Sequence, residues 1–371
     1  MLLVFSCKEE KKVPITSVGT NLSPIQHAKG FSLEKQRSGI TILKISSPWP
    51  NAESAFTYAL VPQEIAPSIT LSKEEYDAVV TVPVQRIIVT STTHIPALES
   101  LGVLDRLVGF PNTNLVSSKL ARQRIDSEQI KELGNNEQIN TEMVIELDPD
   151  IVVGFGISNE NKAYETLQRS NIPVVYNGEW TEETPLGKAE WIKFFAPFFQ
   201  KEAVADSIFS SVKDHYIEAK NLAAKAKSKP TVLTGGLYKD VWHVAGGKSW
   251  MAQFLADAQS NYLWADNTDN GGVALSLEHV LVNGYDADFW FNPSMLTSYD
   301  EMELSNRHYT EFAAFKKQTI YSNTINKGAT GGLLYYELAP NRPDLVLKDL
   351  IYIFHPALLP DHELFFFKPL N

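Results

Sequence analysis

The sequence predicts an α/β fold with two lobes, one long rigid helix that bridges them, and a ligand cleft between the lobes. Apolar, strand-like runs alternate with helical patterns over most of the chain, which favours mostly parallel sheets with helices on both faces. One strand–helix–strand unit occurs twice, and a long helical pattern separates the two copies. A chain of 371 residues is long enough for two domains that each bury a core.

The composition is that of a folded protein, with 44% hydrophobic and 21% charged residues. The formal net charge of -11 disfavours a nucleic-acid partner, because nucleic acids are bound by basic surfaces. No apolar run reaches the roughly 18 residues that a membrane-spanning helix needs.

The only cysteine, Cys7, follows an apolar stretch and a small residue, an order that resembles the end of a bacterial lipoprotein signal. We therefore expect residues 1–7 to be a truncated signal, Cys7 to carry a lipid anchor, and residues 8–30 to be a flexible tether. The charged residues after Cys7 resemble those of Bacteroides-group lipoproteins, which indicates a periplasmic, membrane-anchored protein that could also be displayed at the surface. The alternative is an unmodified cysteine in a frayed terminus.

The N-terminal lobe is expected over residues 31–185. It begins with two strand-like runs, Gly39–Ile45 and Ala55–Leu60, which the turn residues between them join as a hairpin, and residues 62–76 form a loop. An α/β pattern follows, with strands at residues 86–90, 106–110, 151–155 and 173–176 and helices at residues 97–101, 140–147 and 163–169.

A helical pattern over residues 186–229 is expected to bridge the lobes. Its apolar residues recur every three or four positions from Ile208 to Ala226, lysines crowd its last turns, and Pro230 ends it. The uninterrupted part from Lys201 would be about 40 Å long at 1.5 Å per residue. This length suits a strut between two lobes better than an amphipathic helix inside one domain.

The C-terminal lobe, residues 230–371, repeats the alternation of strands and helices of the first lobe. Strands are expected at residues 231–234, 289–291 and 319–321, and helices at residues 250–258, 276–282, 309–316 and 343–354. In both lobes a helix ends in Asp-x-Asp before an apolar strand, at Asp148–Asp150 and Asp286–Asp288. The next strand in each lobe ends in asparagine, Asn177 or Asn323, so the two lobes share one unit.

Four motifs, in chain order, resemble those of class III periplasmic substrate-binding proteins of ABC importers, the group that receives ferric siderophores, haem or cobalamin. They are Gly-x-x-Asp-Arg-Leu-Val-Gly at residues 102–109, Pro149–Val153, Pro185–Trp191, and Arg342–Leu350 with His355-Pro356. The resemblance covers about residues 84–371. It implies two Rossmann-like lobes bridged by one long helix, a small hinge motion, an ABC permease as partner, and no catalysis.

Motifs for catalysis or for a resident cofactor are incomplete. Gly154-Phe155-Gly156 lacks the third glycine of a dinucleotide fingerprint, and Gly247-Lys248-Ser249 has Trp242 where a P-loop needs its first glycine. Cys7 lies outside both lobes, and the eight histidines show no metal-ligand spacing. We therefore expect no enzyme, no cofactor and no protein-bound metal, with a metal-cluster enzyme of similar architecture as an alternative.

Ligand-binding residues are expected in the loops at the carboxyl ends of the strands, where open α/β sheets bind ligands. These loops carry many aromatic side chains, which suit the flat walls of a pocket for a large ligand. The candidates are His94, Phe110, Asn112, Trp180, Tyr238, Trp242, His243, Tyr335 and Tyr336. Among them, Trp180 and Trp242 are expected to face one ligand from opposite lobes.

No arginine falls in these loops, whereas a strongly anionic chelate would need an arginine cluster. This favours a neutral or weakly charged ligand, such as a hydroxamate-like ferric siderophore that brings its own metal, with a cobalamin-like corrinoid as the alternative. A structural surface lipoprotein without a small ligand is a third possibility. The resemblance also implies a glutamate at the outer tip of each lobe for the permease. Glu99 is the candidate in the first lobe, and the matching segment of the second lobe has no carboxylate.

Overall fold

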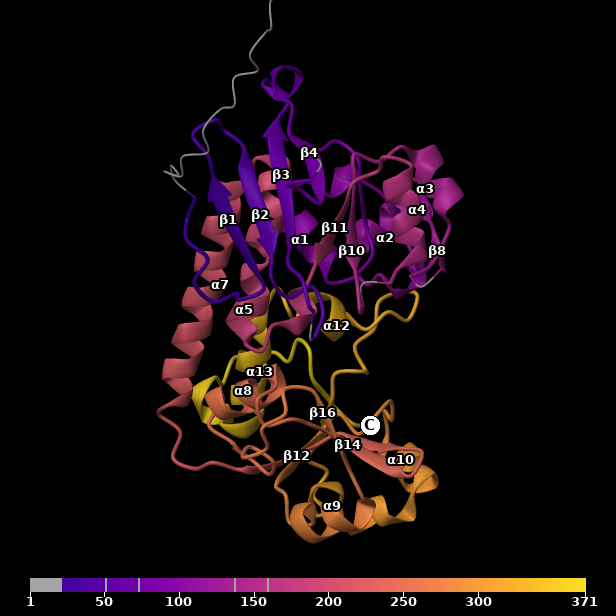
Figure 1. Cartoon of the computed structure of the whole chain (residues 1–371). Coiled ribbons are helices and arrows are strands. Elements are labelled where there is room, and N and C mark those ends of the chain that lie inside the picture. The colour runs from indigo at the N-terminus through magenta and orange to yellow at the C-terminus, as the bar shows by residue number, and fades with distance from the viewer. Residues whose placement is uncertain (1–21, 51, 73, 137, 159) are drawn as a thin grey trace, which may run out of the picture.

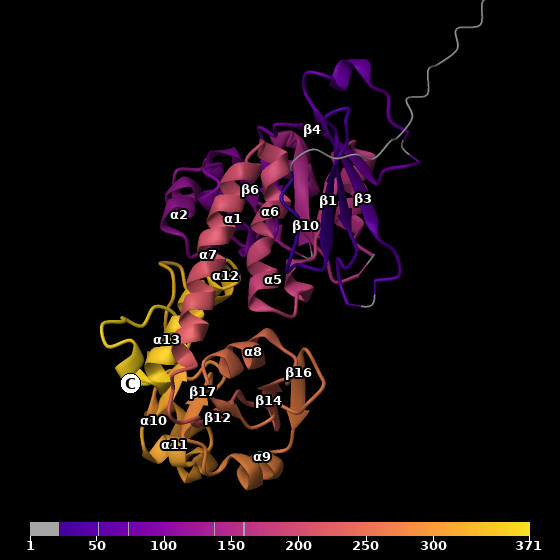
Figure 2. The ribbon, with the colours of Figure 1, turned by 90° about the vertical axis from the view of Figure 1, so that its left-hand side faces the viewer.

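The computed structural model describes residues 22–50, 52–72, 74–136, 138–158 and 160–371. Two lobes lie one above the other, and helix α7 (Glu202–Ala223) runs along one side from the upper lobe to the lower (Figure 1; Figure 2). The predicted fold class is therefore confirmed. Cys7, the expected signal and most of the expected tether lie outside the described residues.

The first lobe is built on a parallel sheet in the order β11-β10-β5-β6-β7. Its strands are β5 (Ile87–Val89), β6 (Leu107–Phe110), β7 (Lys131–Glu132), β10 (Ile151–Phe155) and β11 (Val174–Asn177). Helices α1 (His94–Ser100), α2 (Lys119–Asp126), α3 (Thr141–Leu147) and α4 (Lys162–Arg169) accompany it, together with the short hairpin of β8 (Gly134–Asn135) and β9 (Gln138–Ile139). The carboxylate of Asp150 accepts the backbone N–H groups of Gln85 (2.7 Å) and Arg86 (2.9 Å), and so caps the start of neighbouring β5.

The second lobe has a sheet in the order β15-β12-β17-β18-β19, with only β19 antiparallel to its neighbour. The strands are β12 (Thr231–Thr234), β15 (Asn261–Tyr262), β17 (Phe289–Phe291), β18 (Ile320–Ser322) and β19 (Lys368–Pro369). The helices are α8 (Trp250–Asp257), α9 (Leu277–Gly284), α10 (Tyr299–Ser305), α11 (Ala313–Lys316), α12 (Leu334–Leu338) and α13 (Pro343–Phe354). Asp288 accepts the N–H of Thr231 (2.9 Å) at the start of β12, so the second aspartate of each Asp-x-Asp string has the same structural role.

The bridge between the lobes is more broken than the predicted helix over residues 186–229. It consists of α5 (Pro185–Glu190), α6 (Ile192–Phe195), a 3-10 turn (Ala196–Phe199) and α7. Pro197 has no N–H to donate, and Gln200 adopts a left-handed conformation with φ 57°, so the chain turns before α7 begins. Helix α7 ends at Ala223, where a tighter turn leads toward Pro230.

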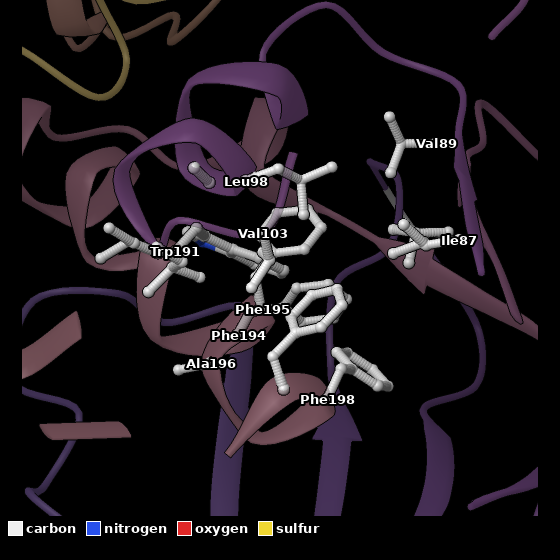
Figure 3. Packing of buried hydrophobic residues seen from close by; sticks show 14 of the residues in the cluster. Ile87, Val89, Leu98, Val103, Trp191, Phe194, Phe195, Ala196 and Phe198 are labelled. Carbon is white, nitrogen blue, oxygen red and sulfur yellow. The ribbon is translucent and has the colours of Figure 1, made fainter. Parts of the chain in front are cut away.

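Helix α7 nevertheless contributes to the cores of both lobes. Its Phe209 and Val212 pack in the first core, whereas Tyr216, Ala219 and Ala223 pack in the second. The segment before α7 belongs to the first core, where Trp191, Phe194, Phe195 and Phe198 cluster with Ile87 and Val89 of β5 (Figure 3). One continuous chain segment therefore holds both lobes by burial of apolar side chains.

A second, four-stranded sheet flanks the parallel sheet of the first lobe (Figure 1). Its strands are β1 (Phe31–Lys35), β2 (Thr41–Ile45), β3 (Phe56–Pro62) and β4 (Ala78–Val82). The predicted hairpin of β2 and β3 is confirmed, but β1 and β4 were not predicted. Along β3, Tyr58 and Leu60 face the core of the first lobe, and Ala59 and Val61 face a smaller cluster under residues 65–71 and Tyr76.

Residues 26–30, the last part of the expected tether over residues 8–30, are held by hydrogen bonds to the bridge. The carboxylate of Glu190 accepts the backbone N–H groups of residues 26–28 at 2.6–3.1 Å. Glu182 accepts those of Lys29 and Gly30 at 2.7 and 2.8 Å. Both carboxylates are buried, so these bonds fix residues 26–30 against the bridge.

Candidate functional site

A cleft of about 750 Å³ lies between the lobes, and three parts of the chain form its walls. Residues 180–184 and Lys188, which follow β11, form the first. The second is the N-terminal segment, with residues 29–30, 46–47, 49–50 and 52. The second lobe supplies Trp250, Asn270 and Gly271. A smaller cavity of about 100 Å³ beside α7 is too small for a chelate.

Trp180 lines this cleft, at the carboxyl end of β11 where the sequence predicted a ligand-binding loop. Its ring packs against Phe155, with 5.5 Å between the ring centroids. Its indole Nε1–H has no hydrogen-bond partner among the described residues. An unpaired donor in a partly buried position gains from a ligand oxygen that accepts it. Ligand contact by Trp180 stays a prediction.

Lys188 places a charge where the two lobes meet. Its Nζ donates to the backbone oxygens of Glu179 and Trp180, both at 3.1 Å, and lies 3.6 Å from the Glu179 carboxylate. The same Nζ lies 5.3 Å from the ring centroid of Trp250 in the second lobe. The cation therefore connects the lobes through its contact with an aromatic ring.

The cleft is lined by equal numbers of positive and negative side chains. The positive ones are Lys29 and Lys188, the negative ones are Glu182 and Glu183, and none of the lining residues is arginine. The Glu182 carboxylate is already occupied by backbone N–H groups and by the indole N–H of Trp191 (3.0 Å). Across the opening, Asn270 Nδ2 donates to Glu183 Oε1 at 3.0 Å. The cleft is therefore lined by aromatic rings and by uncharged polar groups, with no excess of either charge.

Trp242 does not face the cleft, and this expectation was wrong. The segment predicted as a loop forms a hairpin of β13 (Gly236–Tyr238) and β14 (Val241–Ala245), which pairs with β16 (Gly272–Leu275). Strand alternation turns the Trp242 ring into the core, 5.2 Å from that of Trp290, and its Nε1 donates to the oxygen of Thr234. Phe110 and Tyr335 are likewise buried in the two cores.

His94 is also a core residue. It begins α1, is 2% exposed, and its ring lies 5.4 Å from that of Phe195. Burial lowers the pKa of His94 to about 3, so the imidazole is neutral at physiological pH.

The remaining candidates lie outside the cleft lining. Tyr238, Tyr336 and the outward-facing His243 are exposed. Asn112 sits in a left-handed turn with φ 53°, and its backbone N–H donates to Glu132 (3.0 Å). The structure thus brings only Trp180 of the predicted set into the cleft, because the other segments continue into strands, helices or outward turns.

A second contact between the lobes joins α12 to the start of α2, and Figure 1 shows α12 between the lobes. Glu337 of α12 is 2% exposed and accepts the N–H groups of Ser117 (2.5 Å) and Ser118 (2.8 Å). The Ser118 hydroxyl donates to Glu99. Burial, with a further contribution from the Glu99 charge, raises the pKa of Glu337 to about 7. Glu99 therefore faces this junction, and its contact with the permease stays a prediction.

The cleft-lining residues that sequence reasoning missed include Trp49, Lys188, Trp250 and Asn270. Lys188 lies inside the quoted Pro185–Trp191 motif and Trp250 begins a predicted helix, so both stood in recognisable positions. Trp49 lies in the connection between β2 and β3 of the N-terminal sheet, and the rule about the ends of parallel strands does not apply to this antiparallel pair. Within the described ranges, no cluster of histidine, cysteine, aspartate and glutamate is placed to hold a metal ion. None of the helices described is both long and apolar enough to cross a membrane.

A family model described as periplasmic binding protein matches residues 87–324, which is more than half of the chain. An uncharacterized lipoprotein of Methanocaldococcus jannaschii is 25% identical over 302 residues, which cover 79% of this chain and 70% of the relative. A second uncharacterized lipoprotein of that organism is 24% identical, with 79% and 74% covered.

Solved structures share the fold. A possible iron-binding periplasmic solute-binding protein of Staphylococcus epidermidis matches with a TM-score of 0.57 at 18% identity, covering 74% of this chain and 99% of that one. The periplasmic heme-binding protein of Vibrio cholerae matches with a TM-score of 0.54 at 18% identity, covering 71% and 99%. The vitamin B12-binding protein of the same organism matches with 0.51 at 15% identity, covering 75% and 99%.

Proposed function

The chain belongs to the periplasmic binding protein family, and from this membership we propose that it captures a metal chelate in the cleft and delivers it to an ABC permease. The family and the class III architecture are those of transport proteins, not of enzymes, so the metal-cluster enzyme is set aside. Structures of similar fold are described as binding iron, heme or vitamin B12. These descriptions support a chelate as ligand without choosing among them.

The equal number of positive and negative side chains in the cleft is the observation on which the proposed class of ligand rests. A ferric tricatecholate or citrate chelate carries several negative charges, and its burial beside Glu183 without an arginine would be unfavourable. An uncharged or weakly charged ferric hydroxamate avoids this cost, and its apolar linkers suit the three indole rings of Trp49, Trp180 and Trp250. A corrinoid is the second candidate, because its flat macrocycle fits the same aromatic walls.

Thermal unfolding with a ligand panel tests this proposal. The panel contains ferrioxamine B as a ferric trihydroxamate, ferric enterobactin as a tricatecholate, hemin and cyanocobalamin. A ligand that binds only the folded state, at 100 times its Kd, stabilises that state by about 2.7 kcal/mol and raises the Tm. We expect the largest rise with ferrioxamine B. Tightest binding of the tricatecholate would contradict the charge argument, and no response to any member would contradict the proposed function.

We further propose that Cys7 carries a lipid anchor that holds the protein at the membrane facing the periplasm, an idea that the two lipoprotein relatives support. In cells that express the gene with its own leader, Cys7→Ser is expected to move the protein from the membrane fraction to the soluble fraction, because the acylated thiol is lost. Fractionation with an immunoblot measures this, and Ser6→Ala, which keeps the thiol, is the control. A Cys7→Ser protein that stays in the membrane fraction would show the anchor proposal to be wrong.

A further inference from the structure

We propose that the N-terminal sheet is part of the binding site, and that its β2–β3 loop (residues 46–50 and 52) determines which ligands the cleft accepts. The inference rests on the proposed function, because it concerns the same cleft. The family match begins at residue 87, so this sheet lies outside the region that defines the family. Seven of the sixteen residues that line the cleft nevertheless come from residues 29–52.

The β2–β3 loop is seated on the carboxyl ends of β10 and β11. Thr181 donates its hydroxyl to the backbone oxygen of Ser47 at 3.1 Å. A Cβ atom added to Gly178 would lie 2.3 Å from the same oxygen, so the loop packs directly on the backbone there. At the end of β10, a Cβ atom on Gly156 would lie 3.2 Å from the ring of Trp49. The loop therefore occupies the place where ligands of open α/β sheets usually bind.

Trp49 anchors this loop to the first lobe. The side chain is 7% exposed, and its ring packs at right angles to that of Tyr176, with centroids 5.2 Å apart, and near Phe56, at 5.7 Å. At its other end, the loop is tied to residues 29–30, because Ser46 donates its N–H to the oxygen of Gly30 (2.9 Å) and its hydroxyl to that of Lys29 (3.0 Å). The wall is thus fixed at both ends and does not depend on a ligand for its order.

The chemistry of this wall indicates the ligand surface that it fits. Ser46, Ser47, Trp49, Pro50 and Ala52 present hydroxyls, an indole edge, a pyrrolidine ring and a methyl group, with no charge. The charged groups Lys188 and Glu183 lie on the first-lobe wall, and the charged residue of the N-terminal wall, Lys29, lies outside this loop with its Nζ 4.0 Å from the Glu183 carboxylate. A ligand whose rim is uncharged and largely apolar therefore suits the β2–β3 loop, so this loop selects chelates with hydrocarbon linkers over chelates with charged rims.

Two added side chains test the wall, each with a matched control. Pro50 is exposed and Ala52 is half-buried, and both line the cleft, whereas Ala55 is exposed on the same connection but does not line it. We expect Pro50→Trp and Ala52→Phe each to weaken binding of ferrioxamine B by about tenfold or more, because added bulk in a formed wall displaces the ligand. Ala55→Trp and Ala55→Phe should leave the Kd unchanged. Quenching of tryptophan fluorescence gives the Kd, and thermal unfolding without ligand shows whether each variant folds.

The outcomes separate this inference from the proposed function. If Trp180→Ala weakens binding while Pro50→Trp and Ala52→Phe, both folded, bind as the wild type does, the cleft binds the chelate but the N-terminal wall takes no part. That result would overturn the inference alone. If Ala52→Phe unfolds, Pro50→Trp at its exposed position still decides. Binding of ferric enterobactin alone would overturn this inference but not the capture of a chelate, and failure of the wild type to bind any of the four panel members would overturn both proposals.

Discussion

Glu337 is the residue whose surroundings most clearly predict a pH dependence. Its pKa of about 7 in the folded state lies above the ordinary value of 4.5, so the folded protein binds more protons than the unfolded chain between these pH values. The stabilising contribution is present below about pH 4.5 and is lost as the pH rises through 7. A shift of this size corresponds to about 3 kcal/mol in the free energy of unfolding.

In the wild type, this titration lowers the free energy of unfolding as the pH rises from 5 to 8. Glu337→Gln should therefore reduce that decrease, because the amide does not titrate. Urea unfolding at several pH values measures the slope. Glu146→Gln, at an exposed position of α3, is the matched control and should keep the wild-type slope. If Glu337→Gln and the wild type lose stability in parallel as the pH rises, then Glu337 does not titrate in this range.

Trp180 and Trp242 are predicted to respond differently to truncation. Trp180→Ala should weaken binding of ferrioxamine B by about 2 kcal/mol, or roughly thirtyfold, with little change in the Tm of the free protein. Trp242 is fully buried against Trp290, so Trp242→Ala should lower the free energy of unfolding by about 3–5 kcal/mol. Titration and urea unfolding of both variants provide the comparison. A destabilised Trp180→Ala protein with unchanged affinity would make Trp180 a core residue and place the site elsewhere.

The contrast between these tryptophans shows how far sequence reasoning reaches at single residues. Both follow a predicted strand, and the rule about strand ends placed both at the correct edge of a sheet. After β11 the chain makes a short turn and leaves Trp180 beside the cleft. After β12 it continues into a hairpin, whose alternation buries Trp242. The direction that the chain takes after a strand depends on pairing partners distant in sequence, such as β16. The residues next to the strand therefore do not predict this direction.

At the scale of elements, long apolar runs predicted the strands well. The sequence pattern did not predict the points at which the bridging helix is interrupted. The strands β5, β6, β10, β12 and β17 lie where the sequence placed them, because each is a continuous buried run. The predicted bridging helix over residues 186–229 included Pro197, where the chain in fact turns. Short or polar elements such as β4, α2 and α12 were missed, since their positions are set by packing against neighbours rather than by their own periodicity.

Variants of Gln200 test the turn before α7. This residue has a left-handed backbone conformation, which costs a residue with a Cβ atom about 1 kcal/mol in conformational energy. Gln200→Gly should relieve this cost, and after the larger chain entropy of glycine is counted, it should raise the free energy of unfolding by about 0.5 kcal/mol. Gln200→Ala keeps the Cβ atom and should give no gain. Urea unfolding compares the three proteins. A loss of stability in Gln200→Gly would mean that the glutamine side chain, not the backbone, sustains the turn.

At the scale of the whole molecule, two separate contacts limit how far the lobes can move. Helix α7 buries Phe209 and Val212 in one core and Tyr216 and Ala223 in the other. Tyr216 Oη and Lys220 Nζ also bind Asp257 of the second lobe, at 2.7 and 2.8 Å. Closing the cleft by bending α7 would break buried packing, which has no low-energy alternative in a close-packed core.

The α12 junction adds a second restraint away from α7. In addition to the Glu337 contacts, the hydroxyl of Thr330 donates to the backbone oxygen of Asn114 (2.8 Å), and the side-chain amide of Asn341 donates to that of Thr93 (3.0 Å). The backbones also approach closely, because a Cβ atom on Gly332 would lie 2.0 Å from the oxygen of Leu115. A body held along one helix and at a second junction can rotate only slightly before one contact breaks. We therefore predict that ligand binding closes the lobes by no more than a few degrees.

Small-angle X-ray scattering with and without ferrioxamine B should accordingly give nearly superimposable profiles for the wild-type protein. Glu337→Ala with Asn341→Ala weakens the α12 junction but leaves α7 intact, so this variant should show a larger change on binding if the junction is a restraint. A marked compaction of the wild type would mean that neither α7 nor the junction holds the lobes, and that the hinge lies in flexible connections. An unchanged double variant would show that the α12 junction does not restrain lobe motion.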